Sequence, residues 1–267
     1  MQNFFISTYL GRPAEGAGNK AAQRLLDTAI PAARKAEIQI IWLNWGLTDA
    51  EIEGMPPSTR RAFGFEAALG MAGKKKSPAI DAHGVNQAAA EQFIQDKDGV
   101  LEELTENGKP KRIYQGLGSE IGSVVIENGQ NVDAGRLLMR DTWNAALPTA
   151  LNAAYQEGHK IKRKPDVWIH KNRMSGLYST TPCTEYLEKE GIKTLFFAGV
   201  NTDQCVGGSL QDAFTKGWDC ILVKDGCGTT SPEFASDCVE FNCARTWGFV
   251  TDCDGLKKGV QEMLEAK

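Results

Sequence analysis

The chain has 267 residues, of which 42% are hydrophobic and 24% are charged. These values are close to the average for globular proteins, so they exclude collagen, a simple coiled coil and disorder of the whole chain. The formal net charge is -4, and no basic segment is concentrated enough to suggest a nucleic-acid partner. The sequence contains no run of about 18 apolar residues and no secretory signal at its amino end. We therefore expect a cytoplasmic protein with neither a nucleic-acid nor a membrane partner.

The seven cysteines show neither the spacing of a zinc cluster nor that of a disulfide framework. Their number is odd, and no two of them form a C-x-x-C pair. Free thiols are therefore expected, and the role of each depends on where the fold places it.

The amino-terminal part of the chain predicts a helix followed by a strand. Apolar residues at helical spacing predict a helix over residues 19–37, interrupted at Pro31. The apolar, β-rich run 38–43 then predicts a buried strand, as in a parallel sheet. A helix that leads into such a strand suggests a β-α-β arrangement.

The middle of the chain has a different character and predicts an insertion at about residues 64–140. This segment shows little core periodicity beyond a possible short helix over residues 88–93. Within it, Asn128-Gly129 predicts the turn of a hairpin whose first strand covers residues 123–126. We expect the insertion either to cap a site or to form a subunit interface.

The second half of the chain alternates regularly between helices and strands. The predicted elements are helix 142–155, strand 166–170, helix 181–190, strand 194–198, helix 202–216, strand 220–223 and helix 232–247. This rhythm predicts an α/β fold, a three-layer α/β/α sandwich around a parallel sheet. We expect one domain over residues 1–267, with the insertion inside it.

Ligands of open parallel sheets bind at the carboxyl ends of the strands. Four segments that follow predicted strands, or precede the first of them, are therefore candidates for the site: residues 1–3, 44–46, 170–173 and 199–206.

Cys205 lies in the first turn of the helix that follows strand 194–198. The positive end of the helix dipole and unpaired backbone N–H groups favour the thiolate there and can donate to an oxyanion. This is the setting of a nucleophile. The alternative is a small buried core residue, which is the commoner role of a free cysteine.

Lys171 follows strand 166–170, so its ammonium group is expected near the same sheet edge as Cys205. A lysine there can stabilise the thiolate and, when desolvated, accept a proton. The alternative is an ordinary solvated surface lysine.

Two motifs together resemble the isochorismatase-like cysteine hydrolases. They are K-N-R-M-S-G-L-Y-x-x-T from Lys171 to Thr181 and G-V-x-T-D-x-C-V from Gly199 to Val206, followed by D-A-x-x-x-G up to Gly217. The resemblance covers about residues 2–5, 22–43 and 166–250. It implies a parallel sheet of about six strands and a catalytic triad of Asp, Lys and Cys.

The resemblance also implies roles for individual residues. Cys205 would attack a carbonyl carbon to give an acyl enzyme, and Lys171 would polarise the thiolate and assist proton transfer. The backbone N–H groups of Asn201 and Cys205 would form the oxyanion hole. A non-proline cis peptide between Val200 and Asn201 is implied as well.

The triad aspartate has no counterpart within the sequence. In the family the first strand ends in D-x-Q with an aromatic residue soon after, and this pattern places the aspartate one residue before Met1. Two interpretations stay open: a trimmed form of a longer chain, or a molecule whose site is impaired. No other carboxylate is a good substitute, since Asp49 and Glu51 lie beyond the edge of the second strand.

The presence of Cys205 favours an amide or ureido C–N bond in a small molecule as the substrate. The expected substrate-binding residues are Gln2, Phe4, Asn44, Trp45, Arg173 and Tyr178. No cofactor or metal is expected, because the only histidines are His83, His159 and His170 and none follows the second strand. We also expect a homo-oligomer, a dimer or a tetramer.

Two alternatives remain. A hydrolase of isochorismate, a vinyl ether, would need no nucleophilic cysteine. A catalytically impaired family member would have only a binding role.

Overall fold

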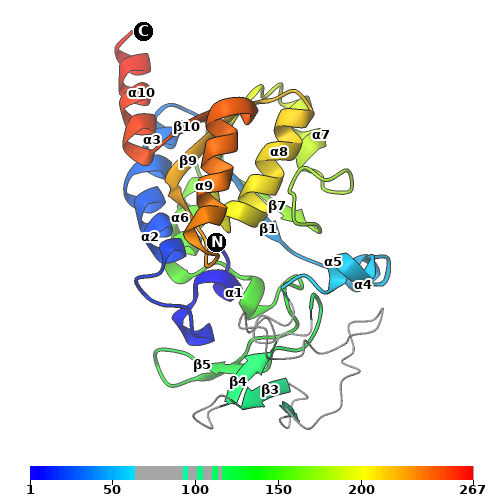
Figure 1. Ribbon diagram of the computed structural model, residues 1–267. Coiled ribbons are helices and arrows are strands. Elements are labelled where there is room, and N and C mark those ends of the chain that lie inside the picture. Colours follow the sequence, from blue (N-terminus) through cyan, green and yellow to red (C-terminus); the bar gives the residue numbers. More distant parts are fainter. Residues whose placement is uncertain (64–92, 96–100, 105–109, 114–115, 267) are drawn as a thin grey trace. The chain divides into compact units, whose positions relative to one another are not determined.

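The computed structural model (Figure 1) describes residues 1–63, 93–95, 101–104, 110–113 and 116–266. The chain forms two compact units. The first comprises Met1–Asn44 and Leu147–Lys267, and the second comprises Trp45–Ala146. Both Lys171 and Cys205 lie in the first unit.

The predicted amino-terminal helix is confirmed, but a π turn divides it. It consists of α2 (Ala17–Arg24), the π turn η2 (Leu25–Ala29) and α3 (Ile30–Lys35). Pro31 is the second residue of α3 and has no backbone N–H to donate, so the regular hydrogen-bond pattern cannot pass through it. Two short turns precede the helix, α1 (Asn3–Ile6) and η1 (Thr8–Leu10).

The described residues of the first unit contain five strands in two groups. Strand β1 (Ile41–Trp45), whose last residue belongs to the second unit, pairs with β7 (Val167–Lys171). Strands β8 (Thr194–Val200), β9 (Asp219–Gly228) and β10 (Phe249–Thr251) form a parallel sheet in the order β10-β9-β8.

Helices cover both faces of this sheet, which confirms the three-layer α/β/α sandwich. On one face, η2, α3 and α10 (Cys253–Glu265) pack on Val223 of β9. On the other face, α7 (Cys183–Lys189), α8 (Gly207–Thr215) and α9 (Glu233–Asn242) pack on Cys220 and Leu222 of the same strand. Successive side chains of a strand point to opposite faces, which explains this division. Figure 1 shows α3 and α10 at the left and α7 and α8 at the right.

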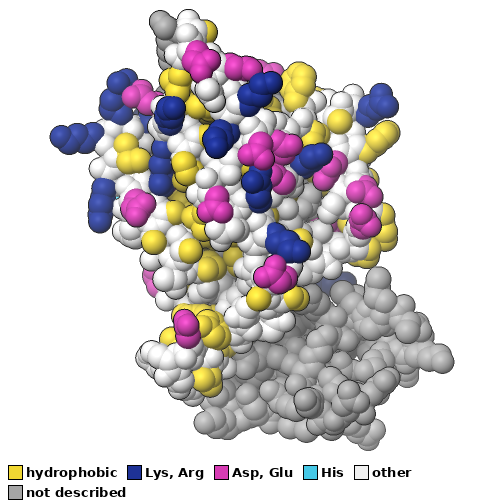
Figure 2. Space-filling view, turned by 90° about the vertical axis from the view of Figure 1, so that its left-hand side faces the viewer, with side chains coloured by type: hydrophobic (Ala, Val, Ile, Leu, Met, Phe, Trp, Pro, Cys, Tyr) yellow, Lys and Arg dark blue, Asp and Glu magenta, His cyan; other side chains and the backbone are white. Residues whose placement is uncertain are grey.

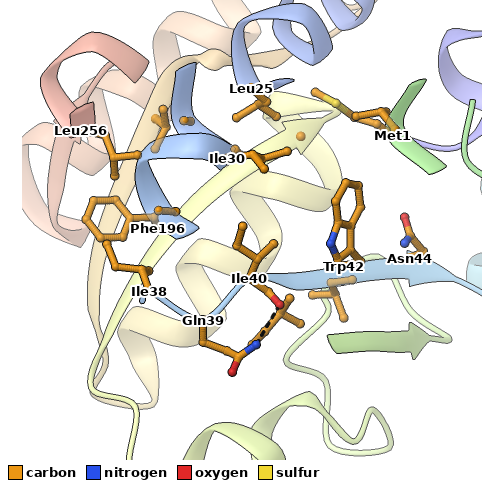
Figure 3. A pocket seen from close by; sticks show the side chains of 18 of the residues that line it. Met1, Leu25, Ile30, Ile38, Gln39, Ile40, Trp42, Asn44, Phe196 and Leu256 are labelled. Atoms are coloured by element: carbon orange, nitrogen blue, oxygen red, sulfur yellow. Dashed lines mark hydrogen bonds between the residues drawn. The ribbon is translucent and has the colours of Figure 1, made fainter. Parts of the chain in front are cut away.

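An apolar cavity of about 220 Å³ lies between β1 and β8 (Figure 3). The lining residues come from β1 and the residues before it, from β8 and β9, and from helices of the covering layers; they include Leu25, Ala33, Ile40, Asn44, Phe196 and Leu256. Among the described strands, β1 pairs only with β7, and β8 only with β9. Within the described part of the chain, β1 and β8 therefore each have one edge without a strand partner. The sixth strand implied by the family resemblance stays a prediction.

One helix begins later than expected, and two elements near the carboxyl end were not foreseen. The predicted helix 142–155 is wrong at its start, because residues 143–145 form a 3₁₀ turn, η4 (Trp143–Ala145), and α6 spans Thr149–Gly158. Pro148 disfavours helical geometry in the residue before it and so sets the helix start. The unforeseen elements are β10 and α10, which follow the π turn η6 (Cys243–Trp247).

The second unit contains short elements. Its helices are α4 (Asp49–Glu53) and α5 (Pro57–Arg60), and β2 (Phe93–Gln95), β3 (Leu101–Leu104) and β4 (Pro110–Ile113) form an antiparallel sheet. The predicted hairpin is confirmed by β5 (Ser123–Val125) and β6 (Asn131–Asp133). Of the short helix suggested over 88–93, residues 88–92 lie outside the described residues, and Phe93 begins β2 instead.

Charged side chains of both signs are interspersed on the face shown in Figure 2. None of the described helices is long and apolar enough to cross a membrane.

Candidate active site

Cys205 lies in a turn that links the end of β8 to α8. The turn is the π turn η5 (Thr202–Val206), and the peptide bond between Val200 and Asn201 is cis. Gly199 has φ of 132°, a region that a residue with a side chain rarely adopts. The carbonyl of Asn201 accepts the backbone N–H groups of Gln204 and Val206, both at 3.1 Å. These bonds hold Cys205, which is only 8% exposed, at the start of a continuous helical segment.

The η5 turn is also tied to the end of β9 through Asp203. The carboxylate of Asp203 accepts the hydroxyl of Thr229 at 2.6 Å and that of Ser231 at 2.8 Å. The position of the turn is thus set by the neighbouring strand as well as by its own.

Lys171 is the last residue of β7 and is buried, with 4% of its surface exposed. Its Nζ donates to the carbonyl of Arg173 at 3.1 Å and to that of Met174 at 2.5 Å. Burial lowers the pKa of Lys171, while the electrostatic interaction and a side-chain hydrogen bond with Cys205 raise it. The structure thus brings Lys171 and Cys205 into contact at the carboxyl ends of β7 and β8.

The first residue of the described chain lies at the same place. Burial lowers the pKa of the Met1 α-amino group to about 5, while Cys205 raises it and Lys171 lowers it through their charges. The backbone nitrogen of Met1 is therefore within electrostatic reach of both residues. Gln2 and Phe4, two predicted binding residues, are buried at 1% and 2% exposure.

Asn44 ends the part of β1 that belongs to the first unit, and it lines the cavity (Figure 3). Its side chain is buried, and its Nδ2 has no hydrogen-bond partner among the described residues. A buried amide without a partner is unusual in a folded protein. The Nδ2 group of Asn44 can therefore donate a hydrogen bond to a ligand. In Figure 3 it lies at the Met1 end of the cavity, while Phe196 and Leu256 lie at the other end.

The other three predicted binding residues have different settings. Arg173 lies with its guanidinium carbon 5.1 Å from the centre of the Tyr178 ring, and its Nη1 donates to the carbonyl of Asn172 at 2.8 Å. Tyr178 is 41% exposed, so this pair lies at the surface of the loop after β7. Trp45 lies in the second unit, where its ring contacts that of Phe63 edge-on.

Ser209 was not identified from the sequence, although it lies in contact with both segments that carry Lys171 and Cys205. Its hydroxyl donates to the Cys205 carbonyl and accepts the N–H of Gly176. The only signal in the sequence is its place one helical turn after Cys205.

Among the described residues, no group of three or more His, Cys, Asp and Glu side chains is arranged to hold a metal ion. The Nδ1 atom of His159 lies 3.4 Å from the carbonyl oxygen of Asp166. The Nδ1 atom of His170 accepts a hydrogen bond from the indole N–H of Trp168 at 3.3 Å. His83 lies outside the described residues.

Comparison with known proteins finds relatives of this fold. Residues 138–240, which include Lys171 and Cys205, match the family model of the isochorismatase domain. The chain is similar to the solved structure of an isochorismatase family protein from Desulfovibrio vulgaris, with 14% identity, a TM-score of 0.57, and coverage of 98% of this chain and 94% of the other. It is also similar to that of a cysteine hydrolase from Pseudomonas syringae pv. phaseolicola, with 13% identity, a TM-score of 0.58, and coverage of 98% and 89%.

At these identities, the structural similarity shows the fold. The resemblance found in the sequence is thereby confirmed: residues 138–240 match the isochorismatase domain, and the chain has the isochorismatase-like fold.

Proposed function

We propose that the chain hydrolyses the C–N bond of an amide or ureido group in a small molecule, with Cys205 as the nucleophile. The observation that carries this proposal is the buried contact between Lys171 and Cys205. A buried ammonium group beside a thiol favours the thiolate, because the ion pair compensates part of the desolvation cost. The thiolate is the form of cysteine that attacks a carbonyl carbon.

The reaction has two halves. In the first, the Cys205 sulfur bonds to the carbonyl carbon, and the resulting oxyanion accepts hydrogen bonds from the backbone N–H groups of Asn201 and Cys205. The C–N bond then breaks, and the amine leaves with a proton from the acid of the site, which gives a thioester. In the second half, water adds to the thioester carbon, loses a proton to the same group, and releases the carboxylic (or carbamic) acid and the free thiolate.

The acid of this scheme is an aspartate, which the family resemblance implies as the third member of the triad. The backbone nitrogen of Met1 lies within electrostatic reach of both Lys171 and Cys205.

The polar groups around Lys171 and Cys205 would orient the substrate. Asn44 offers an unpaired amide donor, and Arg173 offers a cation beside the Tyr178 ring. Gln2 and Phe4 complete the proposed binding set within the first unit, and Trp45, in the second unit, stays a prediction from the sequence.

Selective alkylation tests the nucleophile without knowledge of the substrate. Burial raises the pKa of Cys183 and of Cys220 to about 11, and that of Cys227 and of Cys253 to about 12, so these thiols stay protonated near neutral pH. Burial also raises the pKa of Cys243. Cys238 is exposed, and a Cys238→Ser background removes it. Limiting iodoacetamide at pH 6 should then label Cys205 alone.

Turnover tests the reaction class. With a panel of amides and ureas as substrates, release of amine or ammonia should disappear in Cys205→Ser and Cys205→Ala. Turnover of a vinyl ether that survives Cys205→Ala would show the alternative activity instead. Slow, unselective labelling of the thiols would favour a binding role.

A further inference from the structure

Ser209 connects the two segments that carry Lys171 and Cys205. It lies on α8 and is buried, with 4% of its surface exposed. Its hydroxyl donates to the carbonyl of Cys205 at 2.6 Å, and it accepts the backbone N–H of Gly176 at 2.8 Å. One hydroxyl thus bonds at the same time to the nucleophile's own backbone and to the loop after β7.

That loop also holds the Lys171 ammonium group. The carbonyls of Arg173 and Met174 accept hydrogen bonds from Lys171 Nζ, and Gly176 follows two residues later. A side chain at Gly176 would collide with the side chain of Leu43 on β1, so the loop backbone packs closely against that side chain. The bond between Gly176 and Ser209 therefore ties the loop to α8 at a point where it has little room to move.

The hydrogen bond to the Cys205 carbonyl does not by itself indicate a positioning role, because serine and threonine in helices often donate to a carbonyl one turn earlier. Thr215, on the same helix, does so with the carbonyl of Gln211 at 2.8 Å. The bond from Gly176 is what distinguishes Ser209, and it needs a group that donates and accepts at once.

We propose that Ser209 is a positioning residue for the Lys171–Cys205 pair, an inference that rests on the proposed function of that pair. The attraction between an ammonium and a thiolate falls as the distance between them grows. Without the Ser209 hydroxyl, the loop that holds the ammonium group loses its bond to the helix that begins at the nucleophile. The ammonium then stabilises the thiolate less.

The test compares Ser209→Ala, Ser209→Thr and Thr215→Ala in the Cys238→Ser background. The measurement is the rate constant for alkylation of Cys205 by iodoacetamide between pH 5 and pH 9, with urea unfolding as a check of the fold. In Ser209→Ala, the midpoint of the pH–rate profile should move to higher pH. The rate at pH 6 should fall by roughly three- to tenfold, the factor that corresponds to one hydrogen bond.

Ser209→Thr keeps the hydroxyl and should restore the profile of the unchanged protein. Thr215→Ala removes the matched hydroxyl that bonds only to its own helix, and it should have no effect on the profile. A Ser209→Ala profile identical to that of the unchanged protein would overturn the positioning role and leave the proposed function intact. A rate that falls equally at every pH would also overturn it, since that result indicates a structural role only. If Cys205 in the unchanged protein reacts no faster than an unfolded thiol, the proposed function fails, and this inference fails with it.

Discussion

The cavity between β1 and β8 predicts that two adjacent alanines of α3 respond in opposite ways to the same substitution. Ala33 lines the cavity and is 8% exposed. Ala32 is 7% exposed, is not among the lining residues of the cavity, and belongs to a packed cluster that includes Cys253 and Val260. Ala33→Leu should therefore fill empty space, whereas Ala32→Leu should overfill a packed core. The change in helix propensity is the same at both positions.

The magnitudes follow from the volume of the cavity. The cavity has a volume of about 220 Å³, which is enough space for a leucine side chain. A leucine adds three carbons, which contribute at most about 2.4 kcal/mol when fully buried. Ile38 and Ile40 on the cavity wall are only half-buried, so about 1 to 2 kcal/mol is the expected gain for Ala33→Leu. Ala32→Leu should cost about 1 to 3 kcal/mol.

Urea unfolding of the two variants beside the unchanged protein measures both effects. The midpoint should rise for Ala33→Leu and fall for Ala32→Leu, with similar slopes in all three proteins. If Ala33→Leu destabilises as much as Ala32→Leu, the reasoning is refuted, because that result means the space is already occupied. Such a result would indicate that an extended segment fills the cavity and pairs with the edges of β1 and β8.

Two other substitutions test buried charges. Lys171→Met removes an amino group whose pKa is lowered from 10.5 by burial. Between the lowered pKa and 10.5, the unfolded chain therefore binds more protons than the folded one. The stability of Lys171→Met relative to the unchanged protein should therefore decrease as the pH rises through that window, by about 1.4 kcal/mol for each pH unit. Urea unfolding of both proteins at pH 7 and pH 10 measures this difference in stability. The same difference at both pH values would contradict the reasoning. Asp166→Ala should cost about 3 to 5 kcal/mol, because the carboxylate is buried and accepts Arg34 at 2.6 Å and Trp42 at 2.8 Å. Asp254→Ala removes a carboxylate that is 70% exposed and should leave the unfolding midpoint nearly unchanged.

Local patterns predicted most elements of the first unit. The helix before β1, the strands β7 and β8 and the helices α7 to α9 follow from apolar spacing, which depends only on near neighbours in the chain. The carboxyl-terminal α10 was missed although its apolar residues Leu256, Val260 and Leu264 have helical spacing. Strand β10 has only three residues, which is too short for a clear pattern. The π turns were not predictable, because their hydrogen-bond register depends on the surrounding packing.

The sequence by itself predicted the fold and the candidate pair of site residues. Two motifs with specific spacing identified Lys171 and Cys205, and the rule for carboxyl ends of parallel strands placed them together. Only the tertiary structure decided how the pair is held: by the carbonyls after Lys171, by Ser209 and by the burial that lowers the pKa of the lysine. It also decided that the Asn44 amide lies beside an apolar cavity with no partner for its Nδ2 among the described residues. The reason is physical, because burial and hydrogen-bond partners are set by residues distant in the chain, and these meet only after the sheet and its helices have packed.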